Sequence, residues 1–290
     1  MRGARRVAAV SRALKDMVLP VIKVVAPKAY QRYKFRAIGK LMHEQEIHLL
    51  ELLCDPSKKS LDVGASGGIY TARLLNLSSE VVAFEPRAAA AAQLATLLAS
   101  TGSKASVEAV ALSDSAGHGR LRVLDHEVGR STIEVQNELR GDADNSLTEV
   151  AVTTRVLDDY GYVDVGFVKI DVEGHELAVL RGARRTLLDS QPAVLVEAED
   201  RHRPHAVRDV GQFFEGLNYA GYFLLNGRLQ SLADFDITIH QDPRNVGGAK
   251  DGFRRFGVHV NNFIFVPETR ARRFEQDVAR TFPDGVPEIG

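Results

Sequence analysis

Four ionisable side chains follow one another closely in the segment KIDVEGHELAVLRGA, residues 169–183. Asp171, Glu173, His175 and Glu176 lie between the apolar run VGFVKI, which predicts a strand, and a pattern that predicts a helix. Carboxylates and imidazoles can accept a proton from a reacting hydroxyl group, so these residue types suit general base catalysis. A carboxylate directly after a buried strand is costly unless it is paired or lines a cavity, and Asp171 is therefore a candidate site residue.

The same acids also have a purely structural interpretation. Negative charge near a helix N-terminus stabilises the helix by about 0.3–1 kcal/mol per residue, and we favour this role for Glu176. A metal site built from Asp171, Glu173 and His175 has suitable ligand types. Acids at the start of a helix need not converge on one point, so we expect no metal here.

A glycine-rich segment, DVGASGGIYT at residues 62–71, forms a second group of candidates. Gly64 and Gly68 permit a tight turn and a close approach of the backbone to a ligand. The dinucleotide pattern G-x-G-x-x-G is absent, because Ser66 and Ile69 interrupt it, and no Gly-Lys-Ser or Gly-Lys-Thr follows. The loop therefore matches neither a nicotinamide-binding turn nor a P-loop.

The candidates need elements that bring them to one place. Apolar runs predict strands at 59–64, 80–86, 105–114, 165–172, 193–199, 220–227 and 260–267, and helical patterns at 43–54, 69–77, 88–100, 175–190 and 210–219. Strands separated by helices pair in parallel through right-handed crossovers, which predicts an α/β, doubly wound, seven-stranded sheet. No helical pattern separates the last two strands, so we expect an antiparallel closing strand. Residues 115–157 are expected to form an antiparallel excursion or surface loop.

Polar side chains stand at the carboxyl ends of three successive predicted strands. In doubly wound sheets ligands bind beyond these ends. The glycine-rich loop follows the first strand, and Glu85 ends the second, about 20 residues further on, where an acid can accept both hydroxyl groups of a ribose. Ser113 and Asp114 end the third, where a polar pair could meet an adenine edge. Together these three features predict a nucleotide site.

This order of features resembles S-adenosylmethionine-dependent methyltransferases. Within that class, DVGASGGIYT, AFEP, ALSD, VLDDY and VKIDVEGHELAVLRGA followed by PAVLVEAE resemble the FkbM family, over roughly residues 58–200. The family's usual glycine loop has Asn where this chain has Ser66, which keeps the glycines but removes one possible side-chain contact. The resemblance implies a Rossmann-like methyltransferase sheet with S-adenosylmethionine as cofactor. It also implies a set of cofactor-binding residues: Asp62, Gly64, Gly68, Tyr70, Thr71, Glu85, Ser113 and Asp114.

The resemblance also implies that the fourth strand ends beside the transferred methyl group. An alcohol acceptor loses a proton during transfer, so we expect O-methylation assisted by Asp171, Glu173 or Glu197, with no choice made among the three. The family's acceptors imply a hydroxyl on a sugar, glycolipid or natural product. The alternatives are a nucleotide-dependent oxidoreductase on a similar fold and a non-catalytic binding protein that retains the donor pocket.

Composition sets the remaining expectations. The 290 residues are 44% hydrophobic with a formal net charge of −1, as in an ordinary globular protein, and the single Cys54 excludes an internal disulfide framework. Because a reducing compartment suits such a chain, we expect a cytoplasmic protein. No basic stripe alternates with aromatic residues and Trp is absent, so nucleic acid is not an expected partner.

The first 40 residues carry eleven Lys or Arg against one acid, Asp16. The apolar run MVLPVIKVVAP is too short to span a bilayer and no clean cleavage site follows it, so we expect neither a membrane span nor a secretory signal. We divide the chain into a basic, helical arm at 1–42 and a methyltransferase domain at 43–290. The arm is expected to belong to the fold, or to touch an anionic membrane weakly or an acidic substrate. Lys250, Arg254 and Arg255 could meet an anionic or sugar-rich acceptor, or simply be solvated.

Overall fold

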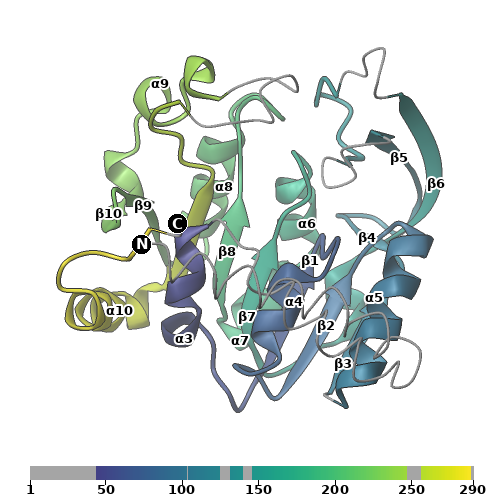
Figure 1. Cartoon of the computed structure of the whole chain (residues 1–290), viewed down its shortest axis with the longest axis horizontal. Coiled ribbons are helices and arrows are strands. Elements are labelled where there is room, and N and C mark those ends of the chain that lie inside the picture. Colours follow the sequence, from purple (N-terminus) through teal and green to yellow (C-terminus); the bar gives the residue numbers. More distant parts are fainter. Residues whose placement is uncertain (1–43, 103, 125–130, 140–145, 247–255, 289–290) are drawn as a thin grey trace, which may run out of the picture.

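The computed structural model describes residues 44–102, 104–124, 131–139, 146–246 and 256–288. The predicted basic arm at 1–42 and the three basic residues Lys250, Arg254 and Arg255 lie outside these ranges. The described elements form an eight-stranded sheet with helices on both faces, and a separate three-stranded sheet stands beside one end of it (Figure 1).

The large sheet has the strand order β10-β9-β11-β8-β7-β1-β2-β3. All neighbouring pairs from β8 to β3 are parallel, and β11 is antiparallel to both β8 and β9. The bounds along the chain are β1 Lys59–Val63, β2 Glu80–Phe84, β3 Ala105–Glu108, β7 Val165–Ile170, β8 Ala193–Glu197, β9 Tyr219–Leu225, β10 Arg228–Ser231 and β11 Asn262–Pro267. The predicted doubly wound, mostly parallel sheet with an antiparallel closing strand is confirmed.

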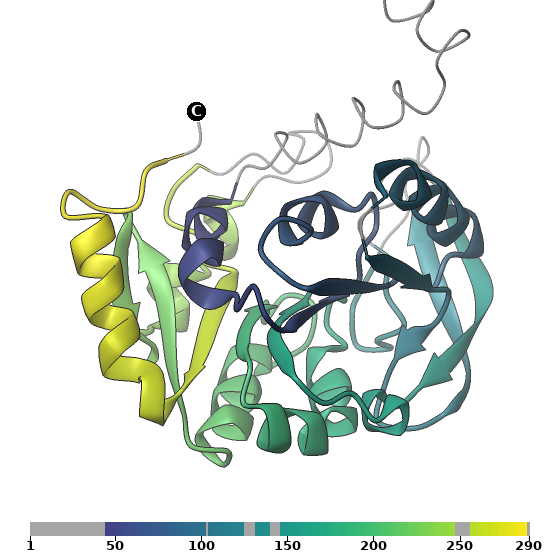
Figure 2. The ribbon, with the colours of Figure 1, turned by 90° about the horizontal axis from the view of Figure 1, so that it is seen from below.

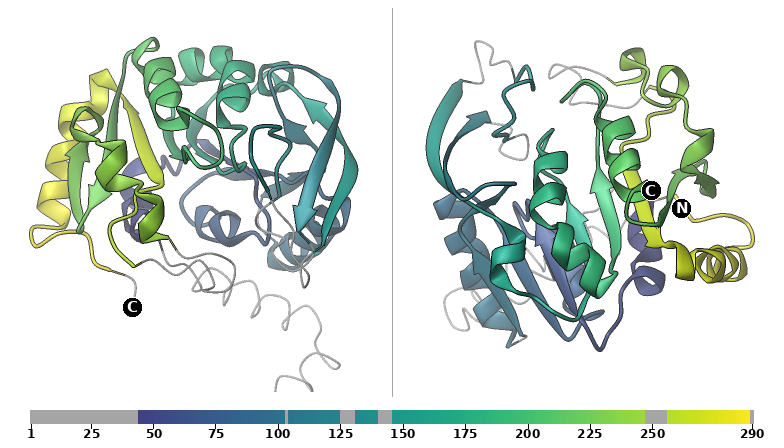
Figure 3. Two further views of the ribbon diagram at one scale, coloured as in Figure 1. Left: turned by 90° about the horizontal axis from the view of Figure 1, so that it is seen from above. Right: turned by 180° about the vertical axis from the view of Figure 1, so that it is seen from behind.

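Two helical layers cover the sheet (Figures 2 and 3). One contains α3 (Leu50–Leu53, after the 3₁₀ turn Gln45–Leu49), α4 (Ile69–Leu74), α5 (Ala88–Thr101) and α10 (Glu268–Thr281). The other contains α6 (Glu176–Gly182), α7 (Arg184–Ser190) and α8 (Ala206–Glu215). Short elements follow β10: a 3₁₀ turn Leu232–Asp234, α9 (Ile237–His240) and a second turn Pro243–Asn245.

The core lies on both faces of the sheet because successive strand residues point in opposite directions. In β7, Phe167 packs with the α3, α4 and α10 side, whereas Val168 and Ile170 pack with the α6 and α8 side. Every residue of β7 is buried. A strand covered on both faces reads as a continuous apolar run, which is why VGFVKI was recognisable.

The strand predicted over residues 105–114 is wrong in its extent. The run 105–114 divides into β3, which ends at Glu108, and β4 (Ala111–Leu112), which belongs to the second sheet. The division arises because β4 pairs with the end of β6 (Leu147–Arg155) instead of β2. In turn β6 pairs antiparallel with β5 (Gly117–Leu124), so the extended segments expected around 115–157 form a ladder.

Three further differences concern counts and bounds. The sheet has eight strands where seven were predicted, because β10 pairs with β9 through a turn at Asn226 and Gly227. The helix predicted over 175–190 is interrupted at Ala183, whose backbone leaves helical geometry between α6 and α7. The C-terminal helix α10 was not predicted.

Candidate active site

The glycine loop leaves β1 and folds between β2 and β7. The N–H groups of Gly64 and Ala65 both donate to Phe84 O at 3.0 Å. Gly64 has φ +83°, and a Cβ atom there would lie 1.8 Å from Asp171 O. Glycine is therefore required at this position both by the backbone conformation and by the close approach of the β7 end. The contact brings the first and fourth predicted strand ends together.

The other predicted cofactor-binding residues near this loop are engaged in contacts within the fold. Asp62 is buried and accepts a hydrogen bond from Thr71 Oγ1, while the Tyr70 hydroxyl donates to Glu44. Burial raises the pKa of Asp62 to about 6, despite the Thr71 hydrogen bond. Gly68, with φ +80°, caps the start of α4. None of these side chains lines the pocket above the loop.

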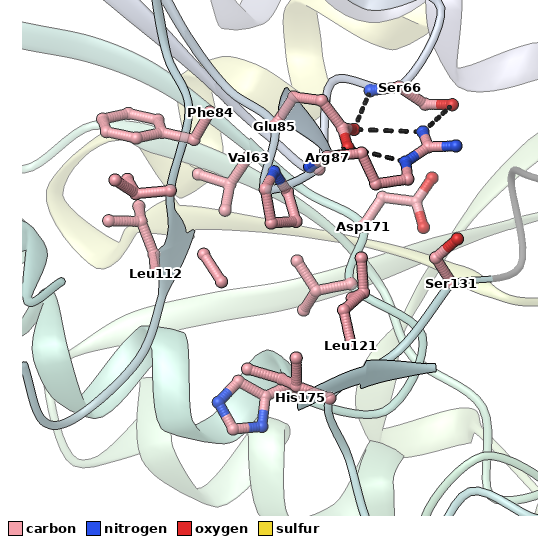
Figure 4. A pocket seen from close by; sticks show the side chains of 16 residues that line it. Val63, Ser66, Phe84, Glu85, Arg87, Leu112, Leu121, Ser131, Asp171 and His175 are labelled. Carbon is pink, nitrogen blue, oxygen red and sulfur yellow. Dashed lines mark hydrogen bonds and ion pairs between the residues drawn. The ribbon is translucent and has the colours of Figure 1, made fainter. Parts of the chain in front are cut away.

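That pocket lies at the carboxyl ends of β1, β2 and β7. Ser66, Glu85, Arg87 and Asp171 contribute a polar side (Figure 4). The opposite side is apolar and comes partly from the second sheet: Val63, Phe84, Val110, Ala111, Leu112, Leu121 and Ile133. A pocket with one polar and one apolar side suits an amphiphilic ligand such as a nucleoside.

Glu85 is the most completely bonded side chain of the pocket. Its Oε2 accepts from Ser66 N at 2.9 Å, and its Oε1 accepts from Arg87 N at 2.9 Å. The Arg87 guanidinium adds Nε to Oε1 at 2.7 Å and a second nitrogen to Oε2 at 3.2 Å. Sequence reasoning identified Glu85 but not Arg87, whose position straight after Glu85 and Pro86 was the available signal.

Ser113 and Asp114 do not line this pocket. The pairing of β3 with β2 ends at Glu108. Ser113 lies beyond that point, is buried against α6, and has its Oγ 2.9 Å from His175 Nε2. Asp114 is exposed. Their predicted contact with an adenine edge has no counterpart in the lining, where Val110, Ala111 and Leu112 stand instead. His175 does line the pocket, and burial lowers its pKa, against the opposing effect of Glu134.

Glu173 is not among the residues that line the pocket. Its backbone has φ +54°, and its carbonyl oxygen accepts from Thr132 Oγ1 at 2.7 Å and from Asn137 Nδ2 at 2.8 Å. Its carboxylate lies 3.1 Å from His202 Nε2, and both side chains are largely buried. These contacts therefore fix Glu173 next to the C-terminal end of β7, where it contributes to the structure and not to the pocket lining.

A buried lysine, Lys169, interacts electrostatically with the carboxyl groups of Asp171 and Glu197. Lys169 lies in β7 beside Asp62 of β1, donates to Asn262 Oδ1 at 3.0 Å, and stands 5.0 Å from the centre of the Tyr70 ring. Burial would lower its pKa, but the charges of Asp171, Glu44, Glu197 and Glu46 outweigh burial and raise it. The sequence signal for this residue was a lysine inside the apolar run FVKI.

Asp171 and Glu197 share this environment. Burial and the charge of Glu197 hold the pKa of Asp171 well above its usual range, although Lys169 opposes them. Burial also raises the pKa of Glu197 to about 8, again against the charge of Lys169. Glu197 Oε1 accepts from Asn261 Nδ2 at 2.7 Å. Carboxyl groups with such pKa values can exchange protons near neutrality.

Glu199, two residues further along, behaves differently. His259 Nε2 lies 2.8 Å from its Oε2, and Arg201 donates to both of its oxygens. Burial alone would raise the pKa of Glu199, but these partners lower it overall. Glu199 is therefore a fixed anion next to the candidate proton acceptors.

No group of three or more His, Cys, Asp or Glu side chains in the described ranges is placed to hold a metal ion. Within the same part of the chain, no helix combines the length and the apolar character needed to cross a membrane.

A doubly wound sheet with a glycine turn after β1 and an acid after β2 defines the chain as a Rossmann-like α/β protein. The family assignment is narrower. Residues 62–224, more than half of the chain, match the family model described as the methyltransferase FkbM domain. The chain therefore belongs to the FkbM methyltransferase family, as the sequence motifs indicated.

Solved structures with similar folds are distant in sequence. Methyltransferase FkbM from Methylobacillus flagellatus is 18% identical with a TM-score of 0.45, and the match covers 73% of this chain but 44% of that one. An O-methyltransferase from Bacillus cereus in complex with SAH is 14% identical with a TM-score of 0.40, covering 86% and 96%. An rRNA methylase from Streptococcus thermophilus is 12% identical with a TM-score of 0.42, covering 77% and 93%. A search of curated proteins found no match.

Proposed function

We propose that the protein is an S-adenosylmethionine-dependent O-methyltransferase that acts on a hydroxyl group of a sugar, glycolipid or natural product. One observation carries the proposal: Gly64, Glu85 and Asp171, from three different strand ends, line one pocket. The family assignment supports methyl transfer. The nearby carboxyl groups with raised pKa values support an acceptor that must lose a proton.

The donor pocket matches the two chemical halves of an adenosine. Glu85 supplies the carboxylate for a ribose, and the apolar side formed by Phe84, Val110 and Leu112 suits a purine ring. Gly64 lets the backbone approach the ligand closely. When bound, S-adenosylmethionine supplies a methyl group that is already activated on a sulfonium. The residues of this chain must then hold the acceptor in line with it and exclude water.

Among the three candidate bases, we propose Glu197. Glu173 is paired with His202, which fits a structural role, and neither Glu173 nor Glu197 is among the residues that line the pocket. Asp171 does line the pocket, and burial and the charge of Glu197 raise its pKa, so we assign it the role of a hydrogen-bond donor to the acceptor. The pKa of Glu197, about 8, is the best matched to proton transfer near neutral pH.

Other proposals rest on sequence alone. We propose that nucleic acid is not the acceptor and that the basic arm at 1–42 makes, at most, a weak contact with a membrane surface. A cytoplasmic location is an expectation of the same kind.

A labelling experiment tests the reaction type. The protein would be incubated with methyl-labelled S-adenosylmethionine and panels of sugars, glycolipids and polyketide-like alcohols, with matched amines as a second panel. The proposal predicts label in a methyl ether, identified by its methyl resonance, and predicts that Glu197→Gln greatly slows its formation. Label that appears only on amines would contradict O-methylation. A donor that binds without any transfer would favour the non-catalytic alternative.

A further inference from the structure

All the hydrogen-bond acceptor positions of the Glu85 carboxylate, which is proposed to bind ribose, are already occupied. An ionised carboxylate offers about four lone-pair positions. Glu85 receives one hydrogen bond from Ser66 N, one from Arg87 N and two from the Arg87 guanidinium. The two hydroxyl groups of a ribose would need two of these positions. At least two existing hydrogen bonds must therefore open before a diol can bind.

The guanidinium is the only one of these donors that can leave. The Ser66 and Arg87 N–H groups belong to the main chain of the glycine loop and of the turn after β2, so they are fixed by the fold. The Arg87 side chain donates to the side chains of Glu85 and Ser66 and borders the pocket (Figure 4). Its exposed fraction is 13% and that of the Glu85 side chain is 3%, so this ion pair is well shielded from water.

The Ser66 hydroxyl also binds the Arg87 guanidinium. The Arg87 nitrogen that reaches Glu85 Oε2 also donates to Ser66 Oγ at 3.1 Å. Arg87 thus bridges the glycine loop after β1 and the acid at the end of β2. These are the two segments between which the ribose of the proposed donor would lie.

We propose that Arg87 occupies the ribose position of the donor pocket and must leave Glu85 when the vicinal diol of the donor binds. Arg87 is then a specificity-determining residue, which lowers the affinity for every adenosine ligand that uses Glu85. This inference rests on the proposed function, because it assumes that the pocket binds S-adenosylmethionine and S-adenosylhomocysteine.

The first test compares S-adenosylhomocysteine binding by calorimetry in the parent and in Arg87→Met. Methionine keeps an apolar stem of similar reach but cannot bond to Glu85. Removal of two charge-assisted competitors should tighten the dissociation constant by about tenfold or more. Arg280→Met is the matched control, because Arg280 is exposed on α10 and pairs with Asp277, far from Glu85 in the sequence. Its dissociation constant should equal that of the parent.

The second test separates competition from a general structural effect. Adenosine and 2′,3′-dideoxyadenosine would be titrated against bound S-adenosylhomocysteine in both proteins. Arg87→Met should improve competition by adenosine and leave 2′,3′-dideoxyadenosine unchanged, because the dideoxynucleoside has no diol for Glu85. A change in a purely structural contact would alter both nucleosides alike.

Ser66→Ala provides an independent variant if Arg87→Met does not fold. It removes the Oγ that fastens the guanidinium but keeps the main-chain N–H on Glu85, so affinity should rise by a smaller factor. Weaker or unchanged binding in Arg87→Met and Ser66→Ala, with the parent binding normally, would overturn the role of Arg87 and leave the methyltransferase proposal intact. Absence of binding in every variant would overturn both.

Discussion

The charge of Lys169 affects the pKa values of the carboxyl groups at the ends of β7 and β8. Lys169 is a cation buried in the middle strand of the sheet, and the charges that surround it keep it protonated. Its positive charge opposes the effect of burial on the pKa of both Asp171 and Glu197, although at Asp171 the charge of Glu197 outweighs that of Lys169. One buried lysine thus allows two carboxyl groups to stand at the same edge of the sheet.

The proposed base makes a pH-dependent prediction. A general base acts in its deprotonated form, and burial raises the pKa of Glu197 to about 8. The value of kcat/KM should therefore rise as the pH increases through about 8. Glu197→Gln should remove this rise and lower kcat by about 10²–10⁴-fold. The measurement is a pH–rate profile from pH 6 to 10.

Glu149→Gln is the control for that profile. Glu149 is an exposed acid on β6, paired with Arg120, and its replacement should leave the ascending limb in place. A Glu197→Gln enzyme with the parent's profile would transfer the role of base to another residue.

The turn between β1 and α4 depends on one glycine far more than on its neighbour. Gly64→Ala would place a Cβ atom 1.8 Å from Asp171 O at a φ of +83°, whereas no atom lies within 4 Å of a Cβ at Gly67. We expect Gly64→Ala to lower the thermal midpoint by several degrees and to abolish S-adenosylhomocysteine binding. Gly67→Ala should retain both properties. Thermal melts with and without ligand would measure this, and equal behaviour of the two variants would contradict the proposed packing.

The parallel strands and their helices were predictable because their signals are local. Each strand is a short apolar run, and each crossover helix has its own periodicity. The strand β10 also carried a local signal, since the pair Asn226 and Gly227 is typical of a two-residue hairpin turn, but the residues after it are polar. The helix α10 was missed because its few buried residues, Ala271, Phe274 and Val278, are spread among charged ones.

The site was only partly predictable, for a different reason. Gly64, Glu85 and Asp171 could be placed together because strand ends of a parallel sheet share an edge. The positions of Ser113 and Asp114 depend on β4 pairing with β6, a contact between distant segments that no local pattern encodes. Similarly, Arg87 stands two residues after Glu85, but that spacing alone does not show that its guanidinium bonds to the Glu85 carboxylate.

The second sheet completes the molecule around the pocket. Leu121 and Ile133 reach the lining from the segment between β4 and β6, and Thr132 and Asn137 fix the backbone of Glu173. The inserted segment therefore connects the donor pocket to the end of β7. Its removal would expose the apolar side of the pocket to water.

The Asn137 contact tests this connection. Asn137→Ala removes a buried donor to Glu173 O and should lower the free energy of unfolding by about 1–3 kcal/mol. It should also weaken S-adenosylhomocysteine binding, since the β7 end is no longer held. Gln136→Ala is the neighbouring control, because Gln136 is exposed. Urea denaturation gives the comparison, and equal stability of the two variants would show that the insertion does not hold this loop.

The most direct test of the donor site is calorimetric titration of the parent protein and of Glu85→Ala with S-adenosylhomocysteine. We predict micromolar binding to the parent with a stoichiometry of one ligand per chain. The Glu85→Ala variant should fold normally and bind at least about tenfold more weakly, because the ribose loses its acceptor. Failure of the parent to bind, or equal affinity in the two proteins, would contradict the assignment of this pocket to the methyl donor.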